Sequence, residues 1–236
     1  MMEPKILYDD NHLIVCVKPA GVLSQADGKD LPDILTILKA YVKEKYHKPG
    51  NVFIGLLHRL DTNVGGVMVF AKTSKAASRL SEAIRGGDFS KRYYAVVNGI
   101  LPVGENRTIV DRLDKDEATK TAFVAEKGFG KEASLTYTVL ETTSFEGAIL
   151  SLLQIELHTG RFHQIRIQMA SRGFPIYGDL KYGKKLPKGQ EGLGLFAYGL
   201  EFEHPVTKEE MRFTALPEEG IFRKFPRFRP EKKPSV

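Results

Sequence analysis

Short alternating runs of apolar and polar residues dominate the chain. Alternation with a period of two predicts strands that bury one face. We expect strands at 5–8, 12–17, 67–71, 91–99, 119–125, 134–140, 148–157, 195–203 and 211–216. The wider segment 107–158 is mostly strand-like, and the apolar run 52–57 ends at a polar interruption. The pattern therefore predicts a protein built mainly of strands.

Helical periodicity appears in fewer places. Residues 33–46 carry apolar side chains on one face, and Pro49-Gly50 follows their end. A second helix is expected from a Thr73 or Ser74 cap to Arg85, stopped by Gly86-Gly87. In 161–172 the apolar residues fit a helix and a strand equally well, so both assignments stay open.

Strands outnumber helices and do not alternate regularly with them. We therefore predict the α+β class, with a mixed, largely antiparallel β-sheet flanked by helices. The 236 residues contain no repeat and no obvious linker. We divide them into one domain, 1–220, and a basic C-terminal tail, 221–236.

Positive charge is concentrated in two places. The tail holds six Lys and Arg residues against one Glu, about five of the net +6. The segment 154–190 carries a similar excess, whereas 101–147 is acidic. Local basic surfaces suit an anionic partner such as a phosphate backbone, although solvated loops often have the same composition.

Composition also excludes several classes of protein. No run of about 18 apolar residues is present, so we expect no membrane span. The first residues lack the layout of a signal peptide, and Cys16 is the only cysteine, which fits the cytoplasm. His58, His158 and His163 lack the spacing of zinc ligands, so we expect no metal.

The segment 58–61, His-Arg-Leu-Asp, groups an imidazole, a guanidinium and a carboxylate before Gly65-Gly66. A carboxylate in such a loop is a candidate nucleophile or general base, and glycines allow another backbone or a ligand to approach closely. Taken alone, a structural ion pair or cap is the more common explanation of this pattern.

A second polar cluster covers 158–166. Its Arg161, Gln164 and Arg166 offer donors suited to a phosphate or a carboxylate, although a wet helix surface would also carry them. In the strand 91–99, Tyr93 and Tyr94 point to opposite faces, so one can stack on a base while the other packs in the core.

The motifs in order resemble those of the RluA-type pseudouridine synthases. The matching segments are 18–21 (Lys-Pro-Ala-Gly), 58–61, 91–99, 159–166 and 175–183. Several motifs in the family's order are far more specific than any one of them. The resemblance implies the pseudouridine synthase fold, with a central catalytic cleft, over roughly residues 6–216.

The resemblance also implies roles for single residues. Asp61 corresponds to the catalytic aspartate, Tyr93 to the active-site tyrosine that stacks on the base, and Arg166 to the arginine that pairs with the aspartate. Arg161 is the reserve candidate for that pair. The remaining substrate-binding candidates are Arg59, which corresponds to the arginine that replaces the flipped nucleotide, then His58, Gln164, and the apolar Ile165 and Ile167.

The implied activity is isomerisation of uridine in tRNA or rRNA to pseudouridine. It needs no cofactor, and we expect a monomer without an obligate protein partner. The target nucleotide has to leave the base stack, and a paired Arg keeps a desolvated aspartate ionised. Whether Asp61 attacks C1′, adds to C6 or removes the C2′ proton stays open.

One departure and two alternatives qualify this reading. After Asp61 the family usually has Thr-Ser-Gly at a spacing of two residues, whereas 62–66 here is Thr-Asn-Val-Gly-Gly, which lacks two hydroxyls. A non-catalytic RNA-binding or assembly factor on the same fold is the main alternative. A glycosidase ranks lower, because no second carboxylate accompanies Asp61 in the motifs.

Overall fold

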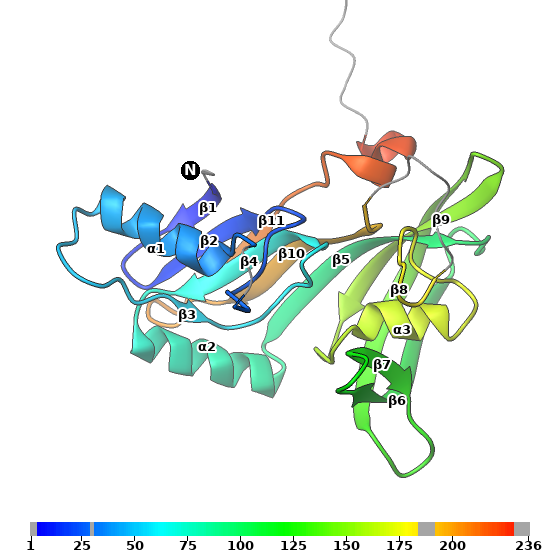
Figure 1. Ribbon diagram of the computed structural model, residues 1–236, viewed down its shortest axis with the longest axis horizontal. Coiled ribbons are helices and arrows are strands. Elements are labelled where there is room, and N and C mark those ends of the chain that lie inside the picture. Colours follow the sequence, from blue (N-terminus) through cyan, green and yellow to red (C-terminus); the bar gives the residue numbers. More distant parts are fainter. Residues whose placement is uncertain (1–3, 29–30, 184–191, 229–236) are drawn as a thin grey trace, which may run out of the picture. The chain divides into compact units, whose positions relative to one another are not determined.

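The computed structural model describes residues 4–28, 31–183 and 192–228 (Figure 1). The chain divides into two compact units. Unit 1 comprises Met1–Arg92 and Ala197–Ala215, and unit 2 comprises Tyr93–Phe196 and Leu216–Val236. Strands β5 (Phe89–Asn98) and β10 (Leu195–Glu203) each run from one unit into the other. Many strands and few helices confirm the predicted α+β class.

Unit 1 is a sheet with a helix on each side. Its strand order is β1-β2-β4-β10, with β3 on β4 and β11 on β10. The strands are β1 (Lys5–Asp9), β2 (Leu13–Lys18), β3 (Gly55–Leu56), β4 (Gly65–Ala71) and β11 (Glu210–Thr214). The pairs β1–β2, β2–β4, β3–β4 and β10–β11 are antiparallel. Helices α1 (Ile34–Lys45) and α2 (Ser74–Gly86) lie on opposite sides of β2 and β4 (Figure 1).

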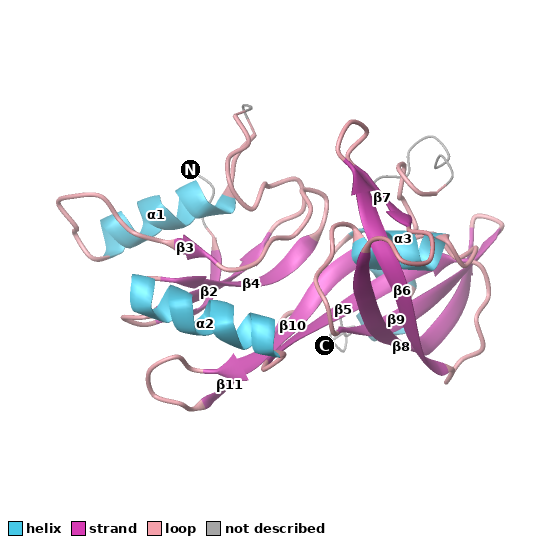
Figure 2. Cartoon of the chain, turned by 90° about the horizontal axis from the view of Figure 1, so that it is seen from below, coloured by secondary structure: helices cyan, strands magenta, loops and turns pink. Residues whose placement is uncertain are grey.

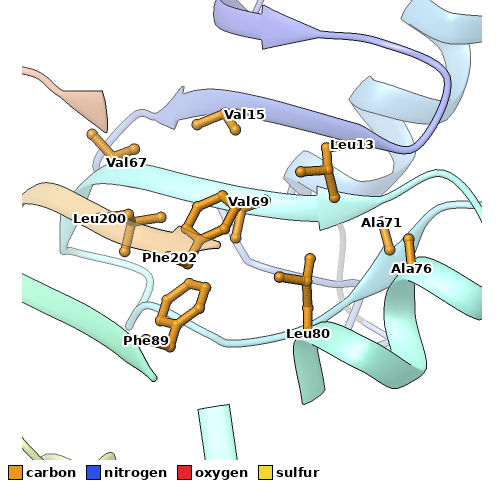
Figure 3. Close-up of a cluster of buried hydrophobic side chains, with 10 residues drawn as sticks. All are labelled: Leu13, Val15, Val67, Val69, Ala71, Ala76, Leu80, Phe89, Leu200 and Phe202. Atoms are coloured by element: carbon orange, nitrogen blue, oxygen red, sulfur yellow. The ribbon is translucent and has the colours of Figure 1, made fainter. Parts of the chain in front are cut away.

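The alternation of the strands explains this arrangement. Residues 13 and 15 of β2, 67, 69 and 71 of β4, and 200 and 202 of β10 form one apolar layer with Ala76 and Leu80 of α2 (Figure 3). The rings of Phe89 and Phe202 stack at 5.1 Å within this layer. The intervening residues of β4 are buried as well. Both faces of the central strands are therefore covered, and the loops at their ends have a rigid base.

Helix caps follow the sequence closely. The Asp33 side chain accepts a hydrogen bond from the Thr36 amide, and the Thr73 side chain accepts one from the Ala76 amide. Gly87 ends α2 in the left-handed conformation. The two predicted helices are thus confirmed to within a residue at each end.

Unit 2 consists mainly of strands, with one short α-helix among its described residues (Figure 2). The order is β5-β9-β8-β6-β7, with β6 (Asn106–Asp116), β7 (Thr121–Val124), β8 (Lys131–Phe145) and β9 (Ala148–Leu157). The pairs β6–β7, β6–β8 and β8–β9 are antiparallel. Residues 161–172 prove to contain a helix, α3 (Gln164–Ala170), which resolves the ambiguity of that segment.

The first part of the predicted basic tail is a packed element of unit 2. Two short 3-10 helices, Gly220–Lys224 and Pro226–Phe228, bury their aromatic side chains, and Phe225 is fully buried. Phe228 meets the ring of Tyr94 edge-on at 5.0 Å. The cations Arg223, Lys224 and Arg227 stay exposed. The last eight residues, 229–236, lie outside the described part, and the division at residue 220 stays a prediction.

Of the helices in the described ranges, none is both long and apolar enough to cross a membrane.

We expect Phe225→Ala to lower the free energy of unfolding by about 3–5 kcal/mol, because it leaves a cavity at a fully buried site. The matched control is Lys224→Ala, which removes an exposed cation lying 4.5 Å from the Phe145 ring and should cost less than about 1 kcal/mol. Urea unfolding of both variants measures the difference. Equal, small losses would show that 220–228 is a loose tail.

Candidate active site

Asp61 starts a tight turn between β3 and β4. The Val64 amide donates to the Asp61 carbonyl at 3.0 Å, which closes the turn. Asp61 is partly exposed, Arg59 is exposed, and Leu60 between them is buried. Val64, which is buried, lies in the stretch where the family usually carries hydroxyl side chains. In this chain the backbone bond between Val64 and Asp61 closes the turn. The loop thus presents a carboxylate and a guanidinium from a fixed backbone.

The residues on both sides of Asp61 are anchored to the segment after β2. The Ser24 hydroxyl accepts from the Leu60 amide at 3.0 Å and donates to the Leu60 carbonyl at 2.8 Å. On the other side, the Thr62 carbonyl accepts from the Gly21 amide at 2.8 Å and from Lys18 Nζ at 3.2 Å. These bonds fix the backbone of Asp61 from both directions.

The structure explains why position 66, the second of the two glycines after the turn, is a glycine. Its φ is +138°, and a Cβ there would lie 2.2 Å from the carbonyl oxygen of Ala197 on β10. A side chain has no room at such a distance. The expectation that a glycine here admits another backbone is therefore confirmed, and the approaching backbone is that of the neighbouring strand.

His58 takes part in the loop's own structure. Its Nε2 accepts a hydrogen bond from the Val69 amide at 3.2 Å, so this nitrogen is unprotonated. Burial, together with the nearby charge of Lys91, lowers the pKa of His58 to about 4. The imidazole is thus a neutral structural acceptor near pH 7. A contact between His58 and substrate stays a prediction.

In unit 2, Gln164 organises the loop that precedes α3. Its Oε1 accepts from the Thr159 hydroxyl at 2.7 Å and from the Arg161 amide at 3.0 Å. Its Nε2 donates to the Ser134 carbonyl on β8 at 3.0 Å. Because Gln164 is buried and its amide bonds to the loop, the geometry gives it a positioning role. A direct contact with substrate also stays a prediction.

Arg166 is held rigidly on α3. Its Nε and Nη2 donate to the two carboxylate oxygens of Asp179 at 2.8 and 2.9 Å. Its guanidinium carbon lies 5.2 Å from the ring centre of Tyr182. Burial alone would raise the pKa of Asp179, but the hydrogen bonds and charge of Arg166 outweigh it and hold that pKa below its ordinary value. The pair therefore keeps Asp179 ionised and fixes the direction of the Arg166 guanidinium.

The other candidates of unit 2 differ in accessibility. Tyr93, on β5, is 7% exposed, and Ile165 is buried on α3, whereas Ile167 is partly exposed. Arg161 is exposed, and its Nε donates to the Glu132 carbonyl at 2.8 Å. His163 has a φ of +51°, an uncommon backbone conformation that often marks functional loops.

The structure thus assembles the candidates into two groups. His58, Arg59 and Asp61 share one loop of unit 1, and the candidates around α3 and β5 share unit 2. Pairing of Asp61 with Arg166, or with Arg161, involves both units and stays a prediction.

From the sequence alone, no role is predicted for three residues that support these groups: Lys18, Ser24 and Asp179. Lys18 and Asp179 lie in motifs that the sequence marks. Ser24 follows the 18–21 motif by three residues and gives no sequence signal of its own.

In the described part of the chain, no group of three or more His, Cys, Asp and Glu side chains is placed to hold a metal ion. The expectation of metal-free chemistry rests on the sequence.

Comparison with known proteins gives a consistent result. The family model described as RNA pseudouridylate synthase matches residues 12–171. The chain is 33% identical over 224 residues to the ribosomal large subunit pseudouridine synthase D of Vibrio cholerae, covering 89% of this chain and 66% of that protein. It is 35% identical to the protein of the same name from Xanthomonas campestris, covering 91% and 66%. The chain thus spans just under two thirds of these relatives.

Two further similarities agree. An uncharacterised RNA pseudouridine synthase of Bacillus subtilis is 32% identical, over 92% of this chain and 71% of that one. Among solved structures, human RNA pseudouridylate synthase domain containing 1 superposes with a TM-score of 0.74 at 21% identity, over 96% of this chain and 86% of that one. This last likeness shows the fold alone.

We expect the imidazole of His58 to stay neutral down to about pH 4, well below the ordinary value of 6.5. Because the unfolded chain binds the proton near pH 6.5, the contribution of His58 to stability is complete above that pH and declines as pH falls toward 4. Histidine NMR shifts against pH measure this directly. His58→Gln, which keeps an acceptor, should lose less stability than the wild type over that window. A His58 midpoint near 6.5 would contradict the assignment.

Proposed function

Because the chain belongs to the RNA pseudouridylate synthase family, we propose that it isomerises uridine in RNA to pseudouridine, with Asp61 as the catalytic carboxylate. The observation that carries the proposal is the presentation of Asp61. It is a partly exposed carboxylate whose two flanking residues, Leu60 and Thr62, are bonded to the segment after β2. Such preorganisation is what a nucleophile needs.

The reaction is balanced without a co-reactant. The N1–C1′ bond of uridine breaks, the uracil turns, and a C5–C1′ bond forms. C5 gives up its proton and N1 gains one. Asp61 acts on C1′, C6 or the C2′ proton, and all three routes require its ionised form. Tyr93, the base-stacking candidate, is our choice for the group that helps remove the C5 proton.

Exposed cations on both units support RNA as the substrate. Arg59 precedes Asp61 and is exposed, which suits the arginine that fills the space of a flipped nucleotide. Arg166, held by Asp179, is the proposed partner of Asp61 in the assembled site. The exposed Arg223, Lys224 and Arg227 add cations suited to phosphate contacts on unit 2.

The names of the Vibrio cholerae and Xanthomonas campestris relatives point to large-subunit rRNA as the RNA to test first. Bulk tRNA is the second, and the cytoplasm is the compartment in which we expect the protein to act. We propose that a monomer carries out the reaction.

We expect wild-type protein to release tritium from C5-labelled uridine in one of these RNAs, and Asp61→Asn to lose more than about 10³-fold of that rate. Asp88→Asn, which changes an exposed carboxylate after α2 in the same unit, is the matched control and should keep full activity. If the wild type binds both RNAs but releases tritium from neither, the result would favour the non-catalytic alternative. Equal rates for wild type and Asp61→Asn would exclude Asp61 as the catalytic group.

We expect Tyr93→Phe to bind RNA normally and to lose about 10²-fold or more in single-turnover rate, since the hydroxyl moves a proton. The adjacent Tyr94→Phe is the control, because Tyr94 packs edge-on against Phe228. Full activity of Tyr93→Phe would leave Tyr93 only its stacking role.

A further inference from the structure

Phe162 and His163, in the loop before α3, form a pair of stacked rings. Their centres lie 3.8 Å apart and their planes differ by 22°. Consecutive side chains of an extended chain point to opposite sides, but the left-handed backbone of His163, with φ at +51°, brings the two rings face to face. Such a backbone is uncommon for a residue with a side chain, and it occurs most often at functional sites.

His163, the less exposed ring of the pair, is held in place by Tyr182. Its Nδ1 lies 2.7 Å from the Tyr182 hydroxyl, and the two rings meet edge-on at 83°. The same hydroxyl accepts a hydrogen bond from the Ala122 amide of β7 at 2.6 Å. The imidazole is therefore anchored to β7 through Tyr182, and the Phe162 ring stacked on it has a fixed support.

The outer ring, Phe162, is 38% exposed. Single apolar side chains at the surface are common and need no explanation. This one differs, because a supporting ring fixes its direction and a cation lies over it. Lys115 Nζ, on β6, is 5.2 Å from the ring centre. Since the imidazole occupies one face at 3.8 Å, the ammonium lies over the other face.

Lys115 can leave the Phe162 ring at little cost. Its side chain is 37% exposed, and it forms an ion pair at 2.8 Å with Glu117, whose side chain is 79% exposed. Exposed ion pairs and exposed contacts between a cation and a ring are both weak. Stacking of a nucleobase on an aromatic face is stronger than either. A base can therefore displace the ammonium, which then lies close to the phosphate of that nucleotide.

The surroundings of Phe162 favour a nucleotide over an apolar protein segment. Arg161 precedes it, is exposed, and has its Nε bonded to the Glu132 carbonyl at 2.8 Å. Together with Lys115, this places two cations beside a single aromatic face. An aromatic ring flanked by cations is the arrangement with which proteins bind single-stranded nucleic acid.

We propose that the exposed face of Phe162 is a stacking site for an unpaired RNA base other than the uridine that reacts, and that Lys115 moves from the ring to the phosphate of the same nucleotide. A reacting base needs an enclosed pocket, whereas the Phe162 ring lies at the surface. The inference rests on the proposed function in that RNA is the ligand, and it adds a contact that recognises unpaired nucleotides.

Fluorescence anisotropy with two labelled oligomers tests the site in the full chain. One is dodecaadenylate, which has bases to stack but no uridine to isomerise. The other is a ribose–phosphate dodecamer without bases, which carries the same phosphates. We expect the wild type to bind dodecaadenylate more tightly, because the base-free oligomer offers only phosphate contacts.

Phe162→Leu removes the aromatic face but keeps an apolar side chain. We expect it to weaken binding of dodecaadenylate about tenfold and to leave binding of the base-free oligomer unchanged, whereas Phe162→Trp should restore the affinity. The matched control is Phe129→Leu, which changes a 68% exposed phenylalanine between β7 and β8 and should alter neither affinity. Equal affinity of wild type and Phe162→Leu for dodecaadenylate, or an equal loss with both oligomers, would overturn the stacking site.

The salt dependence of dodecaadenylate binding tests the part of Lys115. In Lys115→Gln we expect the slope of log affinity against log salt to become shallower by about 0.7, the value for one phosphate contact on a single strand. Lys127→Gln, at an exposed lysine between β7 and β8, is the control and should keep the wild-type slope. A wild-type slope in Lys115→Gln would exclude the phosphate contact.

Should the variants fail to fold, the wild type alone decides. The ring current of a stacked adenine shifts the Phe162 ring protons upfield in the NMR spectrum, and unchanged shifts at saturating dodecaadenylate would exclude the site. Neither oligomer contains uridine, so these results are separate from tritium release. Release by a protein whose Phe162 ignores dodecaadenylate would overturn this inference and leave the proposed function standing. Stacking on Phe162 without release from any RNA would do the reverse.

Discussion

The bonds between the segment after β2 and the residues flanking Asp61 determine how the candidate catalytic loop is built. Ser24 holds Leu60 through two hydrogen bonds, and Gly21 and Lys18 together hold Thr62. Asp61, which lies between these anchors, therefore has little backbone freedom. The cost in conformational entropy of fixing its backbone is incurred when the chain folds, before any substrate binds. The strands that carry this loop are themselves rigid, because residues on both faces of β4 are buried and its core face packs against β2 and α2.

In unit 2, the guanidinium of Arg166 is also fixed by contacts within the protein. Arg166 donates to both oxygens of the buried Asp179 carboxylate and lies over the ring of Tyr182. Asp179 in turn accepts hydrogen bonds from the amides of Lys181 and Tyr182 at 3.0 and 3.2 Å. A long, flexible side chain thereby loses its rotamer freedom before any ligand arrives. Removing either partner would leave a buried charge without compensation, which is far more costly than losing a surface pair.

Local rules predict the helices and most strands of this fold from the sequence. Caps at Asp33 and Thr73, the stop at Gly87 and the apolar runs of β9 and β10 are each determined by a few neighbouring residues. Strand β6 lacks a clean signal, because many of its residues are exposed and charged and its pairing with β8 gives it order. Whether 161–172 is a helix is likewise decided by tertiary bonds, such as those of Gln164 to Ser134.

Motif order identifies the candidate groups, but spacing does not separate residues that react from residues that hold. His58 lies three positions from Asp61, yet its ring accepts a backbone amide and its pKa is lowered to about 4, which makes it a neutral support. Lys18 belongs to a motif that looks like an ordinary turn in the sequence, yet its side chain is buried beside the candidate catalytic loop. The difference lies in burial and in partners distant in sequence, 44 residues apart for Lys18 and Thr62. A motif therefore contains both residues that are candidates to react and residues that support the loop. Burial and hydrogen-bond partners in the folded chain are needed to tell them apart.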